Sequence, residues 1–139
     1  MSSTRSAASY ARGAGAYARV GVESGVMSAS PHQLIMLLFD GAATAIRTAR
    51  LHLRNGNMAE KGKAISKALD IVNQGLLAVL DPDKGGEVAA GLASLYDYVA
   101  RLLLLANLHN DESRLDEAER LLGEIGSAWR DMGRQGQGD

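Results

Sequence analysis

The residue types that could carry metal or nucleophile chemistry are few and scattered in this 139-residue chain. The histidines, His32, His52 and His109, are far apart, and no Glu-x-x-His pair occurs to supply the inward ligands of a di-metal helical bundle. The absence of cysteine excludes a disulfide framework, a thiolate nucleophile and a thiolate metal site. We therefore expect neither a bound metal nor a cofactor.

Motifs for phosphate binding and acyl transfer are also missing from the sequence. Neither Gly-x-x-x-x-Gly-Lys nor Gly-x-Ser-x-Gly occurs. The run Lys84-Gly85-Gly86 looks like part of a phosphate loop, but it follows a predicted helix and lacks the first glycine, which favours a connecting turn. Because no nucleophile, base and orienting group occur in one pattern, we do not expect an enzyme, and binding is the function that the sequence favours.

Composition and charge narrow the class of partner. The formal net charge of -1 provides no positive field for a nucleic-acid backbone or an acidic membrane. Apolar runs such as residues 102–106 are far shorter than the roughly 18 residues of a membrane span, so we expect no membrane insertion. The first 20 residues are rich in Ser, Ala and Arg and lack acids, as transit peptides do, which leaves an organelle protein as a minor alternative to a cytoplasmic one.

The apolar pattern predicts four helices that pack together. Their spans, defined by apolar residues spaced three and four apart, are residues 31–54, 58–80, 87–109 and 112–132. Ser30 is a good N-cap, Pro31 suits the first helical position and Gln33 completes a capping box. Short connections make neighbouring helices antiparallel. The expected fold is all-α, an antiparallel four-helix bundle with residues 1–29 as a mobile N-terminal arm and residues 133–139 as a disordered tail.

Regular apolar stripes should face the core of this bundle. In helix 87–109 the expected inward residues are Val88, Leu92, Leu95, Val99, Leu102 and Ala106. In helix 112–132 they are Leu115, Ala118, Leu122, Ile125, Trp129 and Met132.

Two helices carry more apolar residues than their stripes explain. Leu104 and Leu108 fall roughly opposite the stripe of helix 87–109, and Leu105 lies on its flank. A wide stripe is normal in a bundle, but an apolar face with polar neighbours also suits helix-in-groove binding, in which apolar anchors carry affinity and polar groups set the register. In helix 58–80, Ile71 and Leu77 also lie well outside the apolar stripe. The predicted partner-binding residues are Leu104, Leu108, Leu105, Asn107, Arg101, Asp97, Tyr98, Ile71 and Leu77.

Several gapped motifs resemble the FliS family of flagellin export chaperones. They are Ala16-Tyr17-Ala18-Arg19-Val20-Gly21-Val22-Glu23-Ser24, Met27-Ser28-Ala29-Ser30-Pro31-His32-Gln33-Leu34-Ile35, Leu38-Phe39-Asp40-Gly41-Ala42, Asp83-Lys84-Gly85-Gly86-Glu87, Leu95-Tyr96-Asp97-Tyr98, Ala106-Asn107-Leu108 with Asn110-Asp111, and Ala128-Trp129. The resemblance covers roughly residues 16 to 130, and motifs in one order are far more specific than any single one.

The resemblance implies a cytoplasmic chaperone of the flagellar type III export pathway. Its client would be the carboxyl-terminal segment of flagellin, and its further partners the export gate protein FlhA and, in some members, the anti-sigma factor FlgM. The resemblance also implies that the amino-terminal arm packs on the bundle and shifts when flagellin binds, with Tyr17 and Val20 as the residues that plug the site. The alternative that the residues leave open is a bundle of the same architecture that acts as an adaptor, or as a chaperone for a different secreted client.

Overall fold

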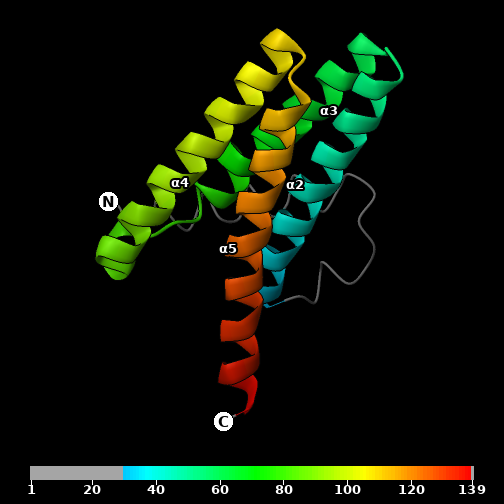
Figure 1. The fold of residues 1–139 in the computed structure, drawn as a ribbon. Coiled ribbons are helices and arrows are strands. Elements are labelled where there is room, and N and C mark those ends of the chain that lie inside the picture. Colours follow the sequence, from blue (N-terminus) through cyan, green and yellow to red (C-terminus); the bar gives the residue numbers. More distant parts are fainter. Residues whose placement is uncertain (1–29, 139) are drawn as a thin grey trace.

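The computed structural model describes residues 30–138, with side chains as far as Arg134, and all regular structure in this range is helical (Figure 1). The elements in chain order are α2 (Pro31–Arg54), α3 (Met58–Asp70), the π-helix η2 (Ile71–Leu76), α4 (Pro82–His109) and α5 (Glu112–Gly138). The helices pack together as the sequence predicts, and consecutive helices run antiparallel (Figure 1). The predicted arm, with Tyr17 and Val20, lies outside the described residues.

Helix α2 begins with the capping box that the sequence predicts. The Ser30 hydroxyl accepts a hydrogen bond of 3.2 Å from the Gln33 amide, and the Gln33 side chain accepts one of 2.9 Å from the Ser30 amide. Two of the amide groups that a helix leaves unpaired at its start are thereby satisfied. From this start α2 buries one face along its length, which consists of Leu38, Phe39, Ala42, Ala45, Ile46 and Ala49.

The second predicted helix is not a regular α-helix throughout. Its last part, η2, is a π-helix, in which the amide of Leu77 donates to the carbonyl of Val72, five residues back, at 2.8 Å. Here η2 approaches α2 so closely that a Cβ at Gly75 would lie 3.0 Å from Leu38. A wider helical turn changes which residues face inward, so a count of about 100° per residue does not hold across η2.

Helix α4 starts earlier than the sequence predicts and contains a break. Asp81 caps its first turn by accepting from the amides of Asp83 and Lys84, and Pro82 occupies the first position. At Gly86 the backbone leaves helical geometry with φ 52° and ψ -127°, angles that only glycine adopts readily. Regular helix follows from Glu87, so the segment predicted to be a turn contains one capped helical turn and then a kink.

Helix α5 continues past the point where the sequence predicts a tail. The tail was expected from Gly133, but the helix extends to Gly138. Gly133 lies beneath a stacked pair of rings: His32 and Trp129 have ring centroids 5.0 Å apart, and the Trp129 indole donates to the carbonyl of His32 at 3.2 Å. A Cβ at Gly133 would lie 2.0 Å from the His32 ring. This glycine therefore permits close packing between α5 and the start of α2 and does not end the helix.

By length and composition alone, one helix in the described part of the chain, α4, passes the test for a membrane span. An 18-residue window of this helix has a mean hydropathy of 1.5, and 33% of that window is buried inside the protein. The lengths of the uninterrupted apolar runs did not reveal it, because polar residues interrupt the apolar sequence of α4 without lowering the mean hydropathy of the helix much. Core helices of soluble proteins pass the same test, and α4 packs against α3, η2 and α5.

Candidate functional site

The outer face of α4, defined here as Asp97, Arg101, Leu104, Leu105 and Leu108, exposes three leucines beside a charged pair. Leu104 is 55% exposed and Leu108 is 73% exposed, and Leu105 is exposed beside them. The neighbouring residues Leu103 and Ala106 are completely buried, so the helix is apolar on both sides. Exposed leucines in a row are the feature expected where another helix docks.

A charged pair continues this face toward the start of α4. The Arg101 guanidinium lies 3.0 Å from the Asp97 carboxylate, one helical turn away, as the sequence predicts. Both side chains are well exposed, so the pair contributes little to stability. Its groups are accessible for hydrogen bonds with a docked segment.

The structure separates the other predicted contact residues from this face. Ile71 is only 2% exposed, and a Cβ at Gly41 of α2 would lie 3.4 Å from its side chain, so Ile71 faces the core and not outward as the sequence predicts. Leu77 is half-buried against the core, because it follows the π-helix. Asn107 is half-buried toward α3, near Gly62, and does not lie on the outer face.

The two tyrosines of helix α4 have different surroundings. Tyr98 is exposed, and its hydroxyl donates a hydrogen bond of 2.6 Å to Glu117 of α5; this bond raises the pKa of Tyr98. Tyr96 is buried, with its ring centroid 6.3 Å from that of Phe39. Burial raises the pKa of Tyr96 to about 12, so its phenol stays protonated and offers no base for catalysis.

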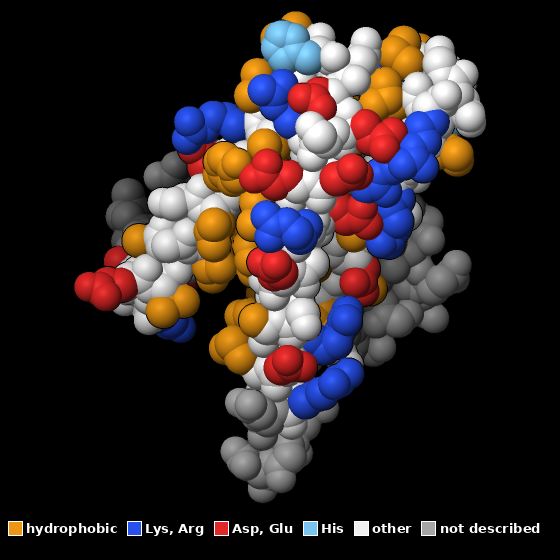
Figure 2. All heavy atoms as spheres, viewed as in Figure 1, with side chains coloured by type: hydrophobic (Ala, Val, Ile, Leu, Met, Phe, Trp, Pro, Cys, Tyr) orange, Lys and Arg blue, Asp and Glu red, His pale blue; other side chains and the backbone are white. Residues whose placement is uncertain are grey.

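The sequence prediction missed a second exposed apolar region. Val88, Leu95 and Met132 were assigned to the core, but all three are exposed. Figure 1 shows the first part of α4 and the last part of α5 diverging from each other, and Figure 2 shows apolar side chains along the border between these two helices. A regular apolar stripe in the sequence shows which side of a helix is apolar. It does not show over what length another helix packs against that side.

The opposite border of α5, against α2, is closed by ion pairs (Figure 2). Arg54 binds Glu112 through two hydrogen bonds of 2.8 and 2.7 Å, and Arg50 bonds Asp116 at 2.9 Å and also Glu119. The bond with Glu119 raises the pKa of Arg50, and the bond with Arg54 lowers the pKa of Glu112. The arginines of α2 thus pair with the carboxylates of α5 and link the two helices along this border.

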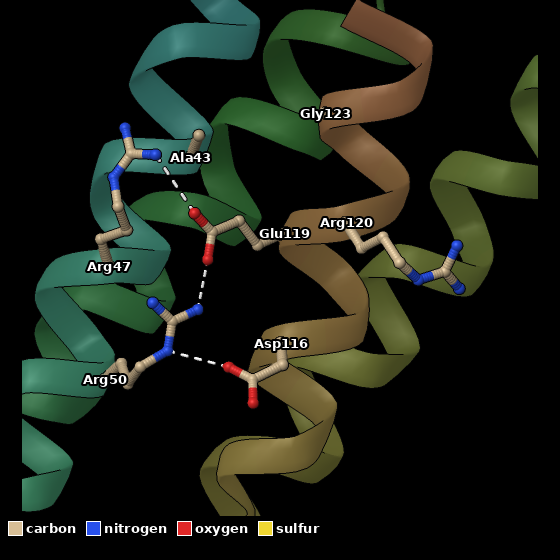
Figure 3. A pocket seen from close by; sticks show the side chains of 7 residues that line it. All are labelled: Ala43, Arg47, Arg50, Asp116, Glu119, Arg120 and Gly123. Atoms are coloured by element: carbon tan, nitrogen blue, oxygen red, sulfur yellow. Dashed lines mark hydrogen bonds and ion pairs between the residues drawn. The ribbon is translucent and has the colours of Figure 1, made fainter.

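A surface hollow of about 390 Å³ lies among these pairs (Figure 3). It is lined by Ala43, Arg47, Arg50, Asp116, Glu119, Arg120 and Gly123. Arg47 and Arg50 both pair with Glu119, whereas Arg120 points away from them (Figure 3) and pairs with Glu124 on its own helix. The arginines therefore do not converge on one point where an anion would bind. Among residues 30–138, no three His, Cys, Asp or Glu side chains are grouped so that they could hold a metal ion.

The fold and this geometry define a small helical binding module whose candidate site is an exposed helix face. A family model described as "Flagellar protein FliS" matches residues 13–136. The chain is 55% identical over 122 residues to the flagellar secretion chaperone FliS of Salmonella typhimurium, which covers 88% of this chain and 90% of the relative. It is 45% identical over 121 residues to the flagellar secretion chaperone FliS of Escherichia coli, and these residues are 87% of this chain and 89% of the relative. The chain belongs to the FliS family of flagellar secretion chaperones.

A further relative shows that the match is not limited to two close species. The flagellar secretion chaperone FliSB of Pseudomonas aeruginosa is 42% identical over 113 residues, which are 81% of this chain and 89% of the relative. The family model covers α2 to α4 completely and α5 as far as residue 136, so the family resemblance of the motifs in the sequence is confirmed.

Proposed function

We propose that this chain binds the carboxyl-terminal segment of flagellin through the outer face of α4, and that it keeps the segment from polymerising before export. The observation that carries the proposal is the exposure of Leu104 and Leu108, at 55% and 73%, on a helix whose other side is already buried. A monomeric protein that keeps such residues in contact with water gains nothing from them in stability.

The chemistry of this face suits an amphipathic helical client. Leu104 and Leu108 are one turn apart and would pack between apolar residues of a docked helix, while Asp97 and Arg101 would hydrogen-bond its polar edge. Covering the apolar side of a client segment removes an aggregation hazard by binding alone, so the activity needs neither a catalytic group nor ATP.

The remaining partner and location assignments are part of the same proposal. The family relatives support a chaperone that acts in the cytoplasm. The family resemblance predicts transfer of the complex to the export gate protein FlhA, contact with the anti-sigma factor FlgM, and competition between the amino-terminal arm and the client. The rival function is that of an adaptor, or of a chaperone for another secreted client, on the same architecture.

Calorimetric titration of the full chain with the carboxyl-terminal segment of flagellin tests the proposal. Leu104→Asp should weaken binding by about tenfold to a hundredfold, because burial of one leucine is worth roughly 1.5–3 kcal/mol. Leu51→Asp is the matched control, since Leu51 is 57% exposed on α2 and away from α4. Circular dichroism should show equal helix content in both variants.

The outcomes of this titration separate the site from the function. Binding that tolerates Leu104→Asp and Leu51→Asp equally would keep flagellin as the client and reject the outer face of α4. A wild-type chain that binds a scrambled peptide of equal composition as tightly as the native segment would reject flagellin recognition and leave the adaptor function.

A further inference from the structure

One strip along α4 presents alanines, then a charged pair, then leucines. Two copies of this strip that run in opposite directions would match each other in size and charge. This outer strip is defined as Ala90, Ala93, Asp97, Arg101, Leu104 and Leu108. At about 100° per residue, these six positions fall within a sector of roughly 80° of the helix surface. All of them are exposed except Ala93, which is half-buried.

The two ends of the outer strip differ in size, and the charges lie between them. The alanines occupy the amino-terminal end, the leucines the carboxyl-terminal end, and Asp97 and Arg101 the middle. Two copies of the helix can lie antiparallel about a twofold axis level with residue 99. The alanine end of each copy then meets the leucine end of the other. Asp97 then lies level with Arg101 of the second copy, and Leu108 lies level with Ala90 of the second copy.

We propose that a second copy of this chain occupies the outer strip of α4 in the free protein, as an antiparallel α4–α4 pair. The charges favour this arrangement because it forms two opposite-charge pairs between the copies, and a twofold interface repeats each contact. A parallel arrangement would place Asp97 beside Asp97 and Arg101 beside Arg101, which is repulsive.

The sizes of the side chains favour the same arrangement. Alanines let a second helix approach closely and leave room for the leucines of the other copy, in the manner of knobs packing into holes. Leu104 and Leu108, exposed in the single chain, become covered. One strip of one helix is a small surface, so the pair belongs to the weak, transient class of contacts that bury less than roughly 1,200 Å².

The consequence for regulation rests on the proposed function, whereas the pairing itself does not. The outer strip contains Asp97, Arg101, Leu104 and Leu108, which are also the proposed client contacts. A client segment then has to displace the second copy, and the leucines stay covered when no client is present.

Sedimentation equilibrium of the full chain at concentrations up to about 1 mM tests the pairing, a range chosen for contacts of the weak class. Asp97→Arg and Arg101→Asp should each weaken self-association about tenfold or more, because two attractive charge pairs become repulsive. An equimolar mixture of the two variants should associate again. The arginine at position 97 of one variant then faces the aspartate at position 101 of the other, and Arg101 of the first faces Asp97 of the second. Only contacts between copies predict this recovery.

Several results would overturn the pairing. A wild-type chain that stays monomeric over the whole range would reject it, as would self-association that both single variants retain or that the mixture does not regain. Leu51→Asp, on another face, should self-associate like the wild type. Because the substituted groups are exposed, circular dichroism should be unchanged, and titration of the same samples with the flagellin segment measures the proposed function separately.

Discussion

The Nζ atom of Lys61 in α3 donates a hydrogen bond of 2.5 Å to Oδ1 of Asn110, the left-handed residue that caps the end of α4. The same ammonium group donates at 3.0 Å to the backbone oxygen of Asn107. Lys61 is 5% exposed, and none of the ion pairs within residues 30–138 includes it. A buried cation is thus stabilised by the negative end of a helix dipole and by two polar oxygens.

Lys61→Met should destabilise the protein by about 2–4 kcal/mol, because hydrogen bonds to a charged group are worth roughly 1.5–3 kcal/mol and the oxygens of Asn107 and Asn110 would lose them. Urea unfolding followed by circular dichroism measures the change. Lys63→Met is the matched control, since Lys63 lies two residues further on the exposed side of α3, where it forms an ion pair with Glu60 at 3.2 Å. Equal stability of the two variants would show that the link between α3 and α4 contributes nothing.

Gly133→Ala should lower the melting temperature, although alanine has the higher helix propensity. The added Cβ would lie 2.0 Å from the His32 ring, which must then leave its stack on Trp129. Gly123→Ala is the matched control in the same helix, because nothing lies within 4 Å of its added Cβ. The control should gain roughly 0.5–1 kcal/mol from propensity alone. Stabilisation by both substitutions would contradict the close packing at Gly133.

Much of the architecture was predictable because its signals are local. The capping box of Ser30 and Gln33 depends on residues three apart, and the exposure of Leu104 and Leu108 follows from helical spacing. The burial of Ile71 was not predictable, since it depends on a π-helix and on a glycine in another helix. Local patterns contain no information about either.

The exposed residues Val88 and Met132 show a second limit of sequence patterns. Both continue regular apolar stripes, yet the start of α4 and the end of α5 diverge, so none of the described helices covers them. Lys61 had a usable signal, because it lies four residues before Ile65 on the buried stripe of α3. A charged residue in phase with a core stripe predicts a buried polar contact. Whether the outer face of α4 binds flagellin stays a prediction.

The ion pair between Arg54 and Glu112 should make stability depend on acidity. The hydrogen bonds from Arg54 lower the pKa of Glu112 below its ordinary value of 4.5, so the folded chain binds this proton less readily than the unfolded chain. The contribution of the pair is therefore complete above that ordinary value and is lost as the pH falls through the lower pKa of the folded chain.

Denaturant unfolding of the wild type and of Arg54→Gln, from about pH 6 to about pH 3, checks this dependence. Near the higher pH the wild type should have the larger free energy of unfolding. The difference in this free energy between the wild type and Arg54→Gln should shrink as the pH falls. High salt should reduce the difference at every pH, because neither group is buried away from solvent. A difference that stays constant with pH would show that Arg54 acts through packing and not through the charge of Glu112.

Removal of one hydroxyl from each tyrosine of α4 should change stability in opposite directions. Tyr96 is 3% exposed, and no side chain or backbone group in the described part of the chain forms a hydrogen bond with its hydroxyl. A buried hydroxyl without a partner costs about 1–3 kcal/mol, so Tyr96→Phe should stabilise the fold by up to that amount. Tyr98→Phe removes the bond of 2.6 Å to Glu117 and should weaken the contact between α4 and α5.

Thermal unfolding of both phenylalanine variants at one neutral pH gives the comparison. The melting temperature should rise for Tyr96→Phe and fall slightly for Tyr98→Phe. Tyr98→Phe combined with Glu117→Gln should be no less stable than Tyr98→Phe alone, because the carboxylate has already lost the hydroxyl that it accepts from. A fall in stability for Tyr96→Phe would mean that the Tyr96 hydroxyl has a hydrogen-bond partner in solution.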